Sequence, residues 1–312
     1  MPLNDYHKRS DFSYFLQKQM MKLNSEHTAS IGLVIGCILF GLGSLIVAYV
    51  PVGAYAIAFW RLLVAASIFY TLAKIFKQSF PSNKKATIYA LTSGAFLGLD
   101  LALWHESIYA VGPGISTLLN SLQIFWLSAI GFFWFKERQT KLQMFSLCLA
   151  IAGVALIASP EFEYNSNAHW GFILGIVSSL MLALSMVYIR KTQQTVATPI
   201  FPLMFKISLG GMAILVLPAL WLNSHNLYPI KWEQIGLIII YGAVMQCFAW
   251  GLIAYSIPLL SLSLTGLLLL SEPVAALIID YLLLDKPINL MQWIGAILTM
   301  IAIYLGSLKT KK

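Results

Sequence analysis

The sequence predicts an all-α membrane protein with ten transmembrane helices arranged as two inverted five-helix repeats. Of its 312 residues, 59% are hydrophobic and only 10% are charged. Between Ile31 and Leu308, apolar stretches of about 20 residues, the length that a helix needs to cross a bilayer, follow one another closely. An internal repeat in the second half of the chain, described below, divides these stretches into two sets of five.

Each apolar stretch is interpreted as one helix, because a helix satisfies its own backbone hydrogen bonds in lipid. The predicted spans cover residues 31–49, 53–73, 86–109, 112–134, 141–158, 169–189, 200–222, 234–255, 259–284 and 290–307. They leave no room for a soluble domain. We therefore expect an N-terminal tail over residues 1–30, a first repeat over 31–158 and a second repeat over 169–308.

The basic residues predict which side of the membrane each loop faces, since short cytoplasmic loops retain Lys and Arg. With the N-terminus inside, most of the 20 basic residues fall in inner segments, and the outer loops hold only Lys231 and Lys286. Both termini are therefore predicted to be cytoplasmic, in the cell inner (plasma) membrane. The same asymmetry explains the net charge of +8, so we expect no nucleic-acid partner.

The N-terminal segment carries charges throughout and lacks the apolar core of a signal peptide. Two interpretations stay open for it. One is a disordered tail. The other is an amphipathic helix on the inner membrane surface, because apolar residues recur there at helical spacing: Phe12, Phe15, Leu16 and Leu23.

The sequence offers no pattern typical of a metal site, a cofactor site or an enzyme. Cys37, Cys148 and Cys247 lie in three different spans without CxxC spacing, and we expect them to be small packing residues. The five histidines form no HxxxH pair or His/Cys cluster. No GxxxxGK[ST] loop is present for ATP. No nucleophile and base stand at a spacing typical of catalysis, so we expect neither a cofactor nor an enzymatic activity.

The internal repeat has a displacement of 148 residues. FKERQTKLQMFSLCLAIAGVALIA, around Glu137, corresponds to LLDKPINLMQWIGAILTMIAIYLG, and Pro51 corresponds to Pro199. Because five helices are an odd number, the second half starts on the opposite side of the membrane, which puts Glu137 inside and Asp285 outside. Inverted repeats of this kind support alternating access, with a substrate site near the bilayer midplane where the halves meet.

Several blocks of the chain resemble the EamA branch of the drug/metabolite transporter superfamily. They are GLVIGCILFGLGSLIVAYVP, AFWRLLVAA, GAFLGLDLALWHESIYAVGPGISTLLNSLQIFWLSAIGFFWFKERQT and SEPVAALIIDYLLLDKPINLMQWIGAILTMIAIY, and the resemblance extends over residues 30–308. It implies a secondary carrier with a central cavity, often an exporter of amino acids or related metabolites. The chain departs from the family at Leu284-Asp285, where Gly-Glu is usual, and near Phe125, where a Pro is expected.

Ionisable residues inside the predicted spans are the main functional candidates, since each costs about 2.5–3.5 kcal/mol at a helix centre on insertion scales. Arg61, Asp100 and Glu272 lie at similar depth in three spans. One interpretation is a structural bridge between Arg61 and a carboxylate. The other, which we favour, is that they handle the substrate or a proton.

Other ionisable residues carry less weight. His105 and Glu106 lie nearer the predicted outer end and off the face of Asp100, as in a water-exposed vestibule or an interfacial contact. Lys206 is close enough to the inner boundary to extend its amine to water. Asp280 approaches the outer end, where we expect it to be hydrated.

Polar and aromatic residues add a predicted lining to the site. Asn120 and Gln123 share one face of the fourth span with Ser116, and Gln246 and Trp250 share one face of the eighth. Each could instead form only a helix-to-helix hydrogen bond, which contributes about 0.6 kcal/mol on average. The full set of candidate substrate-binding or proton-coupling residues is Asp100, Glu272, Arg61, Trp104, Asn120, Gln123, Gln246 and Trp250.

The main functional hypothesis is a secondary transporter that exports a small polar metabolite, an amino acid or derivative, by alternating access. Its expected partners are the small-molecule substrate, membrane lipid, and a proton or counter-substrate that supplies the energy. An importer or exchanger of a cationic nucleoside-type metabolite such as S-adenosylmethionine is an alternative, because four intramembrane acids outnumber two permanent bases. A non-transporting membrane subunit or a membrane-embedded enzyme are alternatives from other classes.

Overall fold

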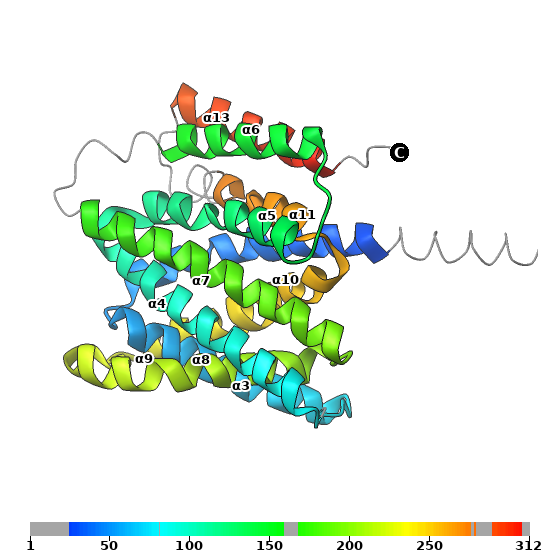
Figure 1. Ribbon diagram of the computed structural model, residues 1–312. Helices are drawn as coiled ribbons and strands as arrows, with labels where there is room; N and C mark the ends of the chain where they lie inside the picture. Colours follow the sequence, from blue (N-terminus) through cyan, green and yellow to red (C-terminus); the bar gives the residue numbers. More distant parts are fainter. Residues whose placement is uncertain (1–24, 81, 159–167, 276–277, 279–288, 308–312) are drawn as a thin grey trace, which may run out of the picture.

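The computed structural model describes residues 25–80, 82–158, 168–275, 278 and 289–307. Every regular element within these ranges is helical (Figure 1). The predictions for the N-terminal segment, Asp280, Asp285 and Lys286 fall outside the described residues.

The helices follow the order of the predicted spans. The first runs from Ser25 to Gly41. The others are α2 (Gly43–Tyr49), α3 (Ala54–Ile75), α4 (Lys84–Ser121), α5 (Gln123–Phe133), α6 (Lys141–Ala158), α7 (Ala168–Thr195), α8 (Ile200–Leu222), α9 (Trp232–Ile240), the π-helical η3 (Tyr241–Ala249), α10 (Trp250–Ser256), α11 (Leu262–Leu269) and α13 (Leu290–Ser307). Short 3₁₀ turns, η2 (Ser224–Asn226) and η4 (Ile257–Leu259), precede α9 and follow α10.

Five helices of the described chain are long and apolar enough to cross a membrane: Ala54–Ile75, Lys84–Val111, His169–Thr195, Ile200–Leu222 and Trp232–Leu259. They coincide with five of the predicted spans. Apolar helices of 10–17 residues occupy the positions of the other five. The all-helical membrane architecture is thus confirmed, whereas ten crossings stay a prediction.

The 38-residue helix α4 is not straight, although helical backbone continues through it. Ser116 Oγ donates to the carbonyl of Trp104 at 3.2 Å, and Asn120 Nδ2 donates to Asp100 at 2.9 Å. In a straight helix, residues 12 positions apart are separated by about 18 Å. The chain therefore reverses direction between Trp104 and Ser116, and the two arms of α4 correspond to the third and fourth predicted spans.

Three helices are interrupted at a leucine. At Leu42, Leu122 and Leu270, the backbone N–H donates to the carbonyl three residues earlier, at 3.3, 3.1 and 3.2 Å. These short turns separate the first helix from α2, α4 from α5, and α11 from the helical residues that follow it. The sequence predicted continuous spans at all three points, because no proline marks the interruptions. Leu122 and Leu270 correspond to each other at the displacement of the internal repeat.

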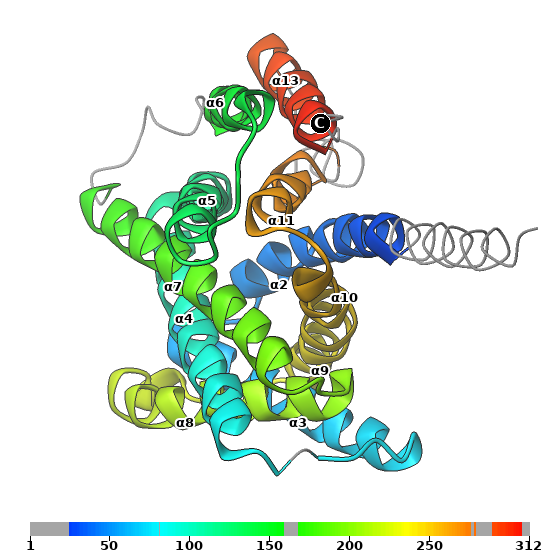
Figure 2. The ribbon, with the colours of Figure 1, turned by 45° about the vertical axis from the view of Figure 1, so that its right-hand side comes forward.

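Paired helices form layers across the molecule (Figures 1 and 2). α6 and α13 lie side by side at one edge, α5 and α11 form the next pair, and α3 and α8 lie at the opposite edge. α4 packs along both α7 and α8. Cys37 and Cys247 are buried as expected, whereas Cys148 on α6 is exposed, so the prediction that it is a core packing residue was wrong.

Glycines allow the closest helix contacts. At the crossing of α4 and α8, a Cβ on Gly94 would meet the carbonyl oxygen of Ile207, and one on Gly98 would lie 2.9 Å from the Cα of Gly211. In the first helix, a Cβ on Gly36 would lie 2.7 Å from the carbonyl oxygen of Ala249. Small residues therefore bring the backbones together, as is common in membrane bundles.

We predict that Gly94→Ala destabilises the protein by about 1–3 kcal/mol, the usual cost of overpacking, because the new methyl group would clash with the backbone carbonyl of Ile207. Thermal unfolding in detergent measures the effect. Gly236→Ala on α9 is the matched control, since nothing lies within 4 Å of its Cβ position. Equal unfolding temperatures for the two variants would contradict the close contact.

Candidate functional site

A buried arginine lies at the centre of the candidate site. Arg61 on α3 is 0% exposed. Its Nη1 donates to the hydroxyl of Tyr241 at 2.5 Å, and its guanidinium carbon lies 5.0 Å from the ring of Phe40 and 4.2 Å from that of Tyr241. Aromatic faces attract cations most strongly where water is excluded. The guanidinium is therefore held mainly by aromatic rings.

His105 holds Tyr241 in place. Its Nδ1 lies 3.2 Å from the carbonyl oxygen of Ala54, and its Nε2 lies 2.9 Å from the hydroxyl of Tyr241. A carbonyl only accepts hydrogen bonds, which puts the proton of the neutral imidazole on Nδ1. Nε2 then accepts from Tyr241, whose oxygen in turn accepts from Arg61. This chain of hydrogen bonds connects α4, η3 and α3.

The expectation that His105 faces a water-exposed vestibule was therefore wrong. The side chain is 0% exposed, because the arm of α4 that carries it packs against the start of α3 and against η3. Glu106, the next residue, is only half-buried.

Asp100 lies on the inner side of the α4 hairpin and is buried. Its Oδ1 accepts from Asn120 Nδ2 at 2.9 Å, and the same amide nitrogen donates to Ser178 Oγ on α7 at 3.0 Å. The predicted pair of Asp100 and Asn120 is thus brought together from the two arms of α4. Ser178 joins them from the second half of the chain.

Glu272 is half-buried and follows the helix interruption at Leu270 by two residues. Arg61 interacts electrostatically with both Glu272 and Asp100. Among the described residues, however, the ion pair that forms joins Arg190 to Glu137 and does not involve Arg61. The bridge between Arg61 and a carboxylate, which the sequence left open, is therefore not made between described atoms.

Aromatic rings enclose the site. Phe40, which directly precedes the break at residues 41–42, lies 6.2 Å from the ring of Trp104 and 6.0 Å from that of Trp250. Both tryptophans are buried. Phe40 and Tyr241 were missed by the sequence analysis. Tyr241 could have been found, because it is a polar aromatic residue inside the span that also carries Gln246.

Gln123 and Gln246 are buried, and each has polar side-chain atoms without a hydrogen-bond partner. Gln123 Oε1 and both polar atoms of Gln246 have none in the structure. Gln246 belongs to η3, and π-helical segments are often found at functional sites. No contact among the described residues joins Gln123 to Arg61, so its place in the site stays a prediction.

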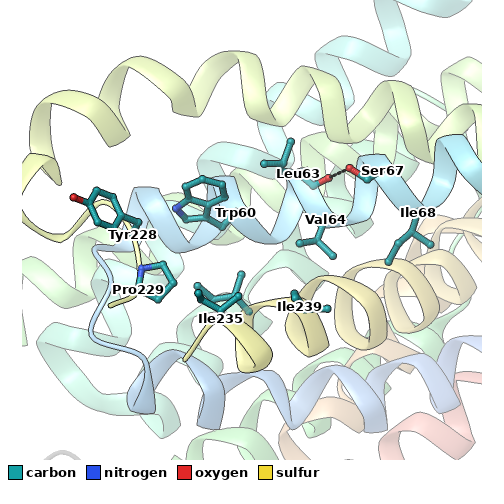
Figure 3. Close-up of a pocket in the computed structure, with 10 residues that line it drawn as sticks. Trp60, Leu63, Val64, Ser67, Ile68, Tyr228, Pro229, Ile235 and Ile239 are labelled. Carbon is teal, nitrogen blue, oxygen red and sulfur yellow. Dashed lines mark hydrogen bonds between the residues drawn. The ribbon is translucent and has the colours of Figure 1, made fainter. Parts of the chain in front are cut away.

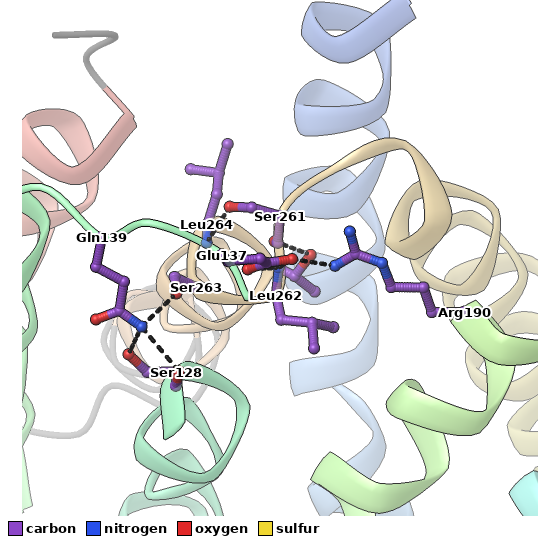
Figure 4. A network of polar contacts seen from close by, with 9 residues as sticks. Ser128, Glu137, Gln139, Arg190, Ser261, Leu262, Ser263 and Leu264 are labelled. Carbon is purple, nitrogen blue, oxygen red and sulfur yellow. Dashed lines mark hydrogen bonds and ion pairs between the residues drawn. The ribbon is translucent and has the colours of Figure 1, made fainter. Parts of the chain in front are cut away.

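A second polar network lies at one end of the bundle (Figure 4). Glu137 forms an ion pair with Arg190 on α7, and its carboxylate accepts from the backbone N–H of Leu262, the first residue of α11, at 3.2 Å. Gln139 Nε2 donates to Ser128 Oγ at 2.6 Å and to Ser263 Oγ at 3.1 Å. The segment after α5 is thereby fastened to two helices of the second half.

This inner network, defined by Glu137, Gln139 and Arg190, lies where the charge pattern predicts the cytoplasmic side. Lys191, next to Arg190, places its amine 3.4 Å from the ring centre of Trp134 and 5.8 Å from that of Tyr89. Lys85 lies against the same Tyr89 ring. Basic residues from two predicted inner segments therefore gather at this end of the molecule.

The molecule also has an apolar groove of about 630 Å³ between α3 and the segment that leads into α9 (Figure 3). Its lining includes Trp60, Val64, Ile68, Tyr228 and Ile239. The hydroxyl of Ser67, which also lines the groove, donates a hydrogen bond to the carbonyl of Leu63 at 2.9 Å. The groove contains no charged residue, so it does not coincide with the polar candidate site.

Comparison with known proteins decides the family. The sequence model described as "EamA-like transporter family" matches twice, over residues 13–159 and 169–308, and so covers most of the chain. The chain belongs to the EamA-like transporter family. The resemblance inferred from the sequence is confirmed, and with it the membrane setting and the class of transporter rather than enzyme.

EamA-like relatives are distant in sequence. An uncharacterized transporter of Synechocystis is 24% identical over 273 residues, which are 80% of each chain. A probable amino-acid metabolite efflux pump of Escherichia coli is 24% identical over 204 residues, 64% of this chain and 68% of that protein. One solved crystal structure superposes with a TM-score of 0.73 at 12% identity and covers 91% of this chain and 96% of its own. That last likeness shows the fold alone.

We predict that Glu137→Gln loosens the inner network, since the ion pair with Arg190 is lost and hydrogen bonds to charged groups contribute about 1.5–3 kcal/mol. A cysteine introduced at the buried Ser263 reports the change, in a background without the native cysteines. We expect it to react faster with a membrane-impermeant thiol reagent in the Glu137→Gln variant.

Arg138→Gln is the matched control, because Arg138 is the exposed neighbour of Glu137 and takes no part in the inner network. It should leave the labelling rate unchanged. If labelling is accelerated equally in both variants, the labelling rate depends on the overall charge at this end and not on the contacts of Glu137.

Proposed function

We propose that this EamA-like protein is a secondary transporter that exports a small polar metabolite, an amino acid or a close derivative, across the inner membrane. The observation that carries the proposal is the group formed by the buried Arg61 and Asp100 and the half-buried Glu272, which come from three helical segments and interact electrostatically without an ion pair between described atoms. Charges are rarely buried inside a membrane protein unless they serve a substrate or ion pathway.

The charge types favour a zwitterionic substrate. One guanidinium and two carboxylates within electrostatic range offer a place both for an anionic group and for a cationic group. An amino acid carries one of each. We infer export as the direction of transport because the Escherichia coli relative is described as a probable amino-acid metabolite efflux pump.

Two features support alternating access between inverted halves. The family model matches each half separately. The interruptions at Leu122 and Leu270 occupy equivalent places in the two halves, and each lies next to a candidate residue, Gln123 and Glu272. Broken helices at the junction of inverted repeats are typical of secondary transporters, because they free polar groups to face a substrate.

In this mechanism, the inner network holds the two halves together at the predicted cytoplasmic end. Glu137 from the first half binds Arg190 and the start of α11 from the second half, and these contacts must break before the halves separate at that end. With both termini cytoplasmic, the described conformation is closed toward the cytoplasm. Coupling to a proton or a counter-substrate would supply the energy, with Asp100 and Glu272 as the candidate proton carriers.

A cationic nucleoside-type metabolite such as S-adenosylmethionine is the second candidate substrate. It is favoured by the excess of acids, since Arg61 faces two carboxylates. Uptake of labelled amino acids and of S-adenosylmethionine by proteoliposomes separates the two. Transport of neither compound class would favour the non-transporting subunit.

We predict that Asp100→Asn and Glu272→Gln each slow amino-acid transport in proteoliposomes by about ten- to hundredfold, the equivalent of losing one hydrogen bond to a charged group. Both changes keep the side-chain size and remove the charge, so the fold should be retained. Initial rates of counterflow measure the effect.

Glu106→Gln serves as the control, because this acid lies on the same helix as Asp100 but is half-buried and outside the Arg61 contacts. It should transport at the wild-type rate. If Asp100→Asn and Glu272→Gln also transport at that rate, the two carboxylates have no part in the mechanism.

A further inference from the structure

Three side chains around the candidate site carry buried polar atoms without any hydrogen-bond partner. They are Nε and Nη2 of Arg61, both polar atoms of Gln246, and Nε1 of Trp250. All three residues are at most 2% exposed. Because an unsatisfied buried donor costs about 1–3 kcal/mol, such a concentration of unused donors needs an explanation.

The unused atoms of Arg61 lie on one edge of its guanidinium group. Nη1 donates to Tyr241, and the guanidinium carbon lies 5.0 Å from the ring centre of Phe40 and 4.2 Å from that of Tyr241. The N–H bonds of Nε and Nη2 run parallel along the remaining side edge. That edge binds a carboxylate with two parallel hydrogen bonds.

No carboxylate among the described residues uses this edge. Neither Asp100 nor Glu272 forms an ion pair with Arg61 within the described part of the chain, and Asp100 Oδ1 is engaged by Asn120. A protein carboxylate bound there would satisfy Arg61 permanently. Because no such carboxylate is bound, the edge is available to a ligand that binds and dissociates.

Trp250 and Gln246 belong to the same stretch of the chain as Tyr241. The ring of Trp250 lies 6.0 Å from that of Phe40, and the guanidinium carbon of Arg61 lies 5.0 Å from the same Phe40 ring. Gln246 stands one helical turn before Trp250 and shares η3 with Tyr241, the partner of Arg61. An indole N–H, an amide N–H and a guanidinium edge are all donors, so the group they would share is an acceptor.

We propose that the side edge of Arg61, together with Gln246 and Trp250, is an anion subsite that binds the carboxylate of the transported molecule. Asp100 and Glu272 are then left for its ammonium group. The identity of the whole substrate rests on the proposed function, whereas the anion subsite can be tested without it.

Access to the subsite requires a local movement. The unused Arg61 atoms have almost no exposed surface in the described conformation. The half-buried Phe40 ring lies against the guanidinium and directly precedes the helix interruption at Leu42. A ligand would therefore reach the edge only after neighbouring side chains such as Phe40 move.

The test uses the purified full-length protein and three probes: 3-phenylpropionate, its methyl ester, and 2-phenylethylamine. Their common ring contacts the aromatic residues, while only the first carries a carboxylate. Calorimetry or ligand-induced thermal stabilisation gives the dissociation constants. We expect the acid to bind at least about tenfold more tightly than the ester, because only the carboxylate accepts two charge-assisted hydrogen bonds. Equal binding of acid and ester, or no binding of the acid, overturns the proposal.

Two variants identify the residues responsible. Arg61→Lys keeps the charge and loses the two-pronged edge, so we expect the preference for acid over ester to fall about tenfold. Gln246→Met has a similar shape and removes the unsatisfied amide. It should bind the acid more weakly without a lower unfolding temperature, since replacing an unpaired polar group costs no hydrogen bond. A Gln246→Met protein that is destabilised yet binds the acid normally would show that the amide is structural, and this overturns its role.

Amino-acid counterflow separates this proposal from the proposed function. If amino acids are not transported but the Arg61-dependent preference for the acid is found, the anion subsite stands and the proposed substrate class fails. If amino acids are transported and Arg61→Lys handles them as the wild type does, the transport function stands and the subsite is overturned.

Discussion

The structure depends on burying one permanent positive charge, that of Arg61, which forms no ion pair with a carboxylate among the described residues. A guanidinium stays ionised under all physiological conditions, so its surroundings must compensate for lost hydration. The compensation comes from two aromatic faces and one phenol, and the phenol is itself held by His105 and, through it, by the carbonyl of Ala54. Three helices are fixed relative to one another by this requirement.

The incomplete pairing of Arg61 has a functional meaning. A bidentate ion pair with Asp100 or Glu272 would satisfy the guanidinium better but would also lock the helices together. The described contacts instead leave one edge of the cation unused and keep both acids within electrostatic range. In the proposed mechanism, a ligand that satisfies these open donors would shift the protein toward the conformation that binds it.

Helix interruptions supply the polar surroundings that an apolar bundle otherwise lacks. Phe40, Gln123 and Glu272 each lie within two residues of a leucine at which the regular hydrogen bonding stops. The π-helical η3 places Tyr241 and Gln246 in the same region. At one end of the bundle, Glu137 binds both Arg190 and the first turn of α11. Charged groups therefore join the two halves at that end.

The sequence by itself determined the class of protein, the order of its apolar helices and the residues that carry buried charge. Apolar stretches of spanning length and the scarcity of charged residues are local properties, which is why Arg61, Asp100 and Glu272 could be selected without coordinates. Asp100 and Asn120 were likewise selected as candidate residues, but the hydrogen bond between them was not predicted.

Only the tertiary structure decided which partners these residues have. Nothing in the sequence indicated that Arg61 would bind Tyr241, that His105 would be buried, or that Arg190 would pair with Glu137 across 53 positions. The physical reason is that lipid-facing and core-facing side chains of a membrane helix are equally apolar, so hydrophobic periodicity does not tell the two faces apart. Contacts made by single polar groups therefore set the orientation of each helix, and such contacts exist only once the bundle has assembled.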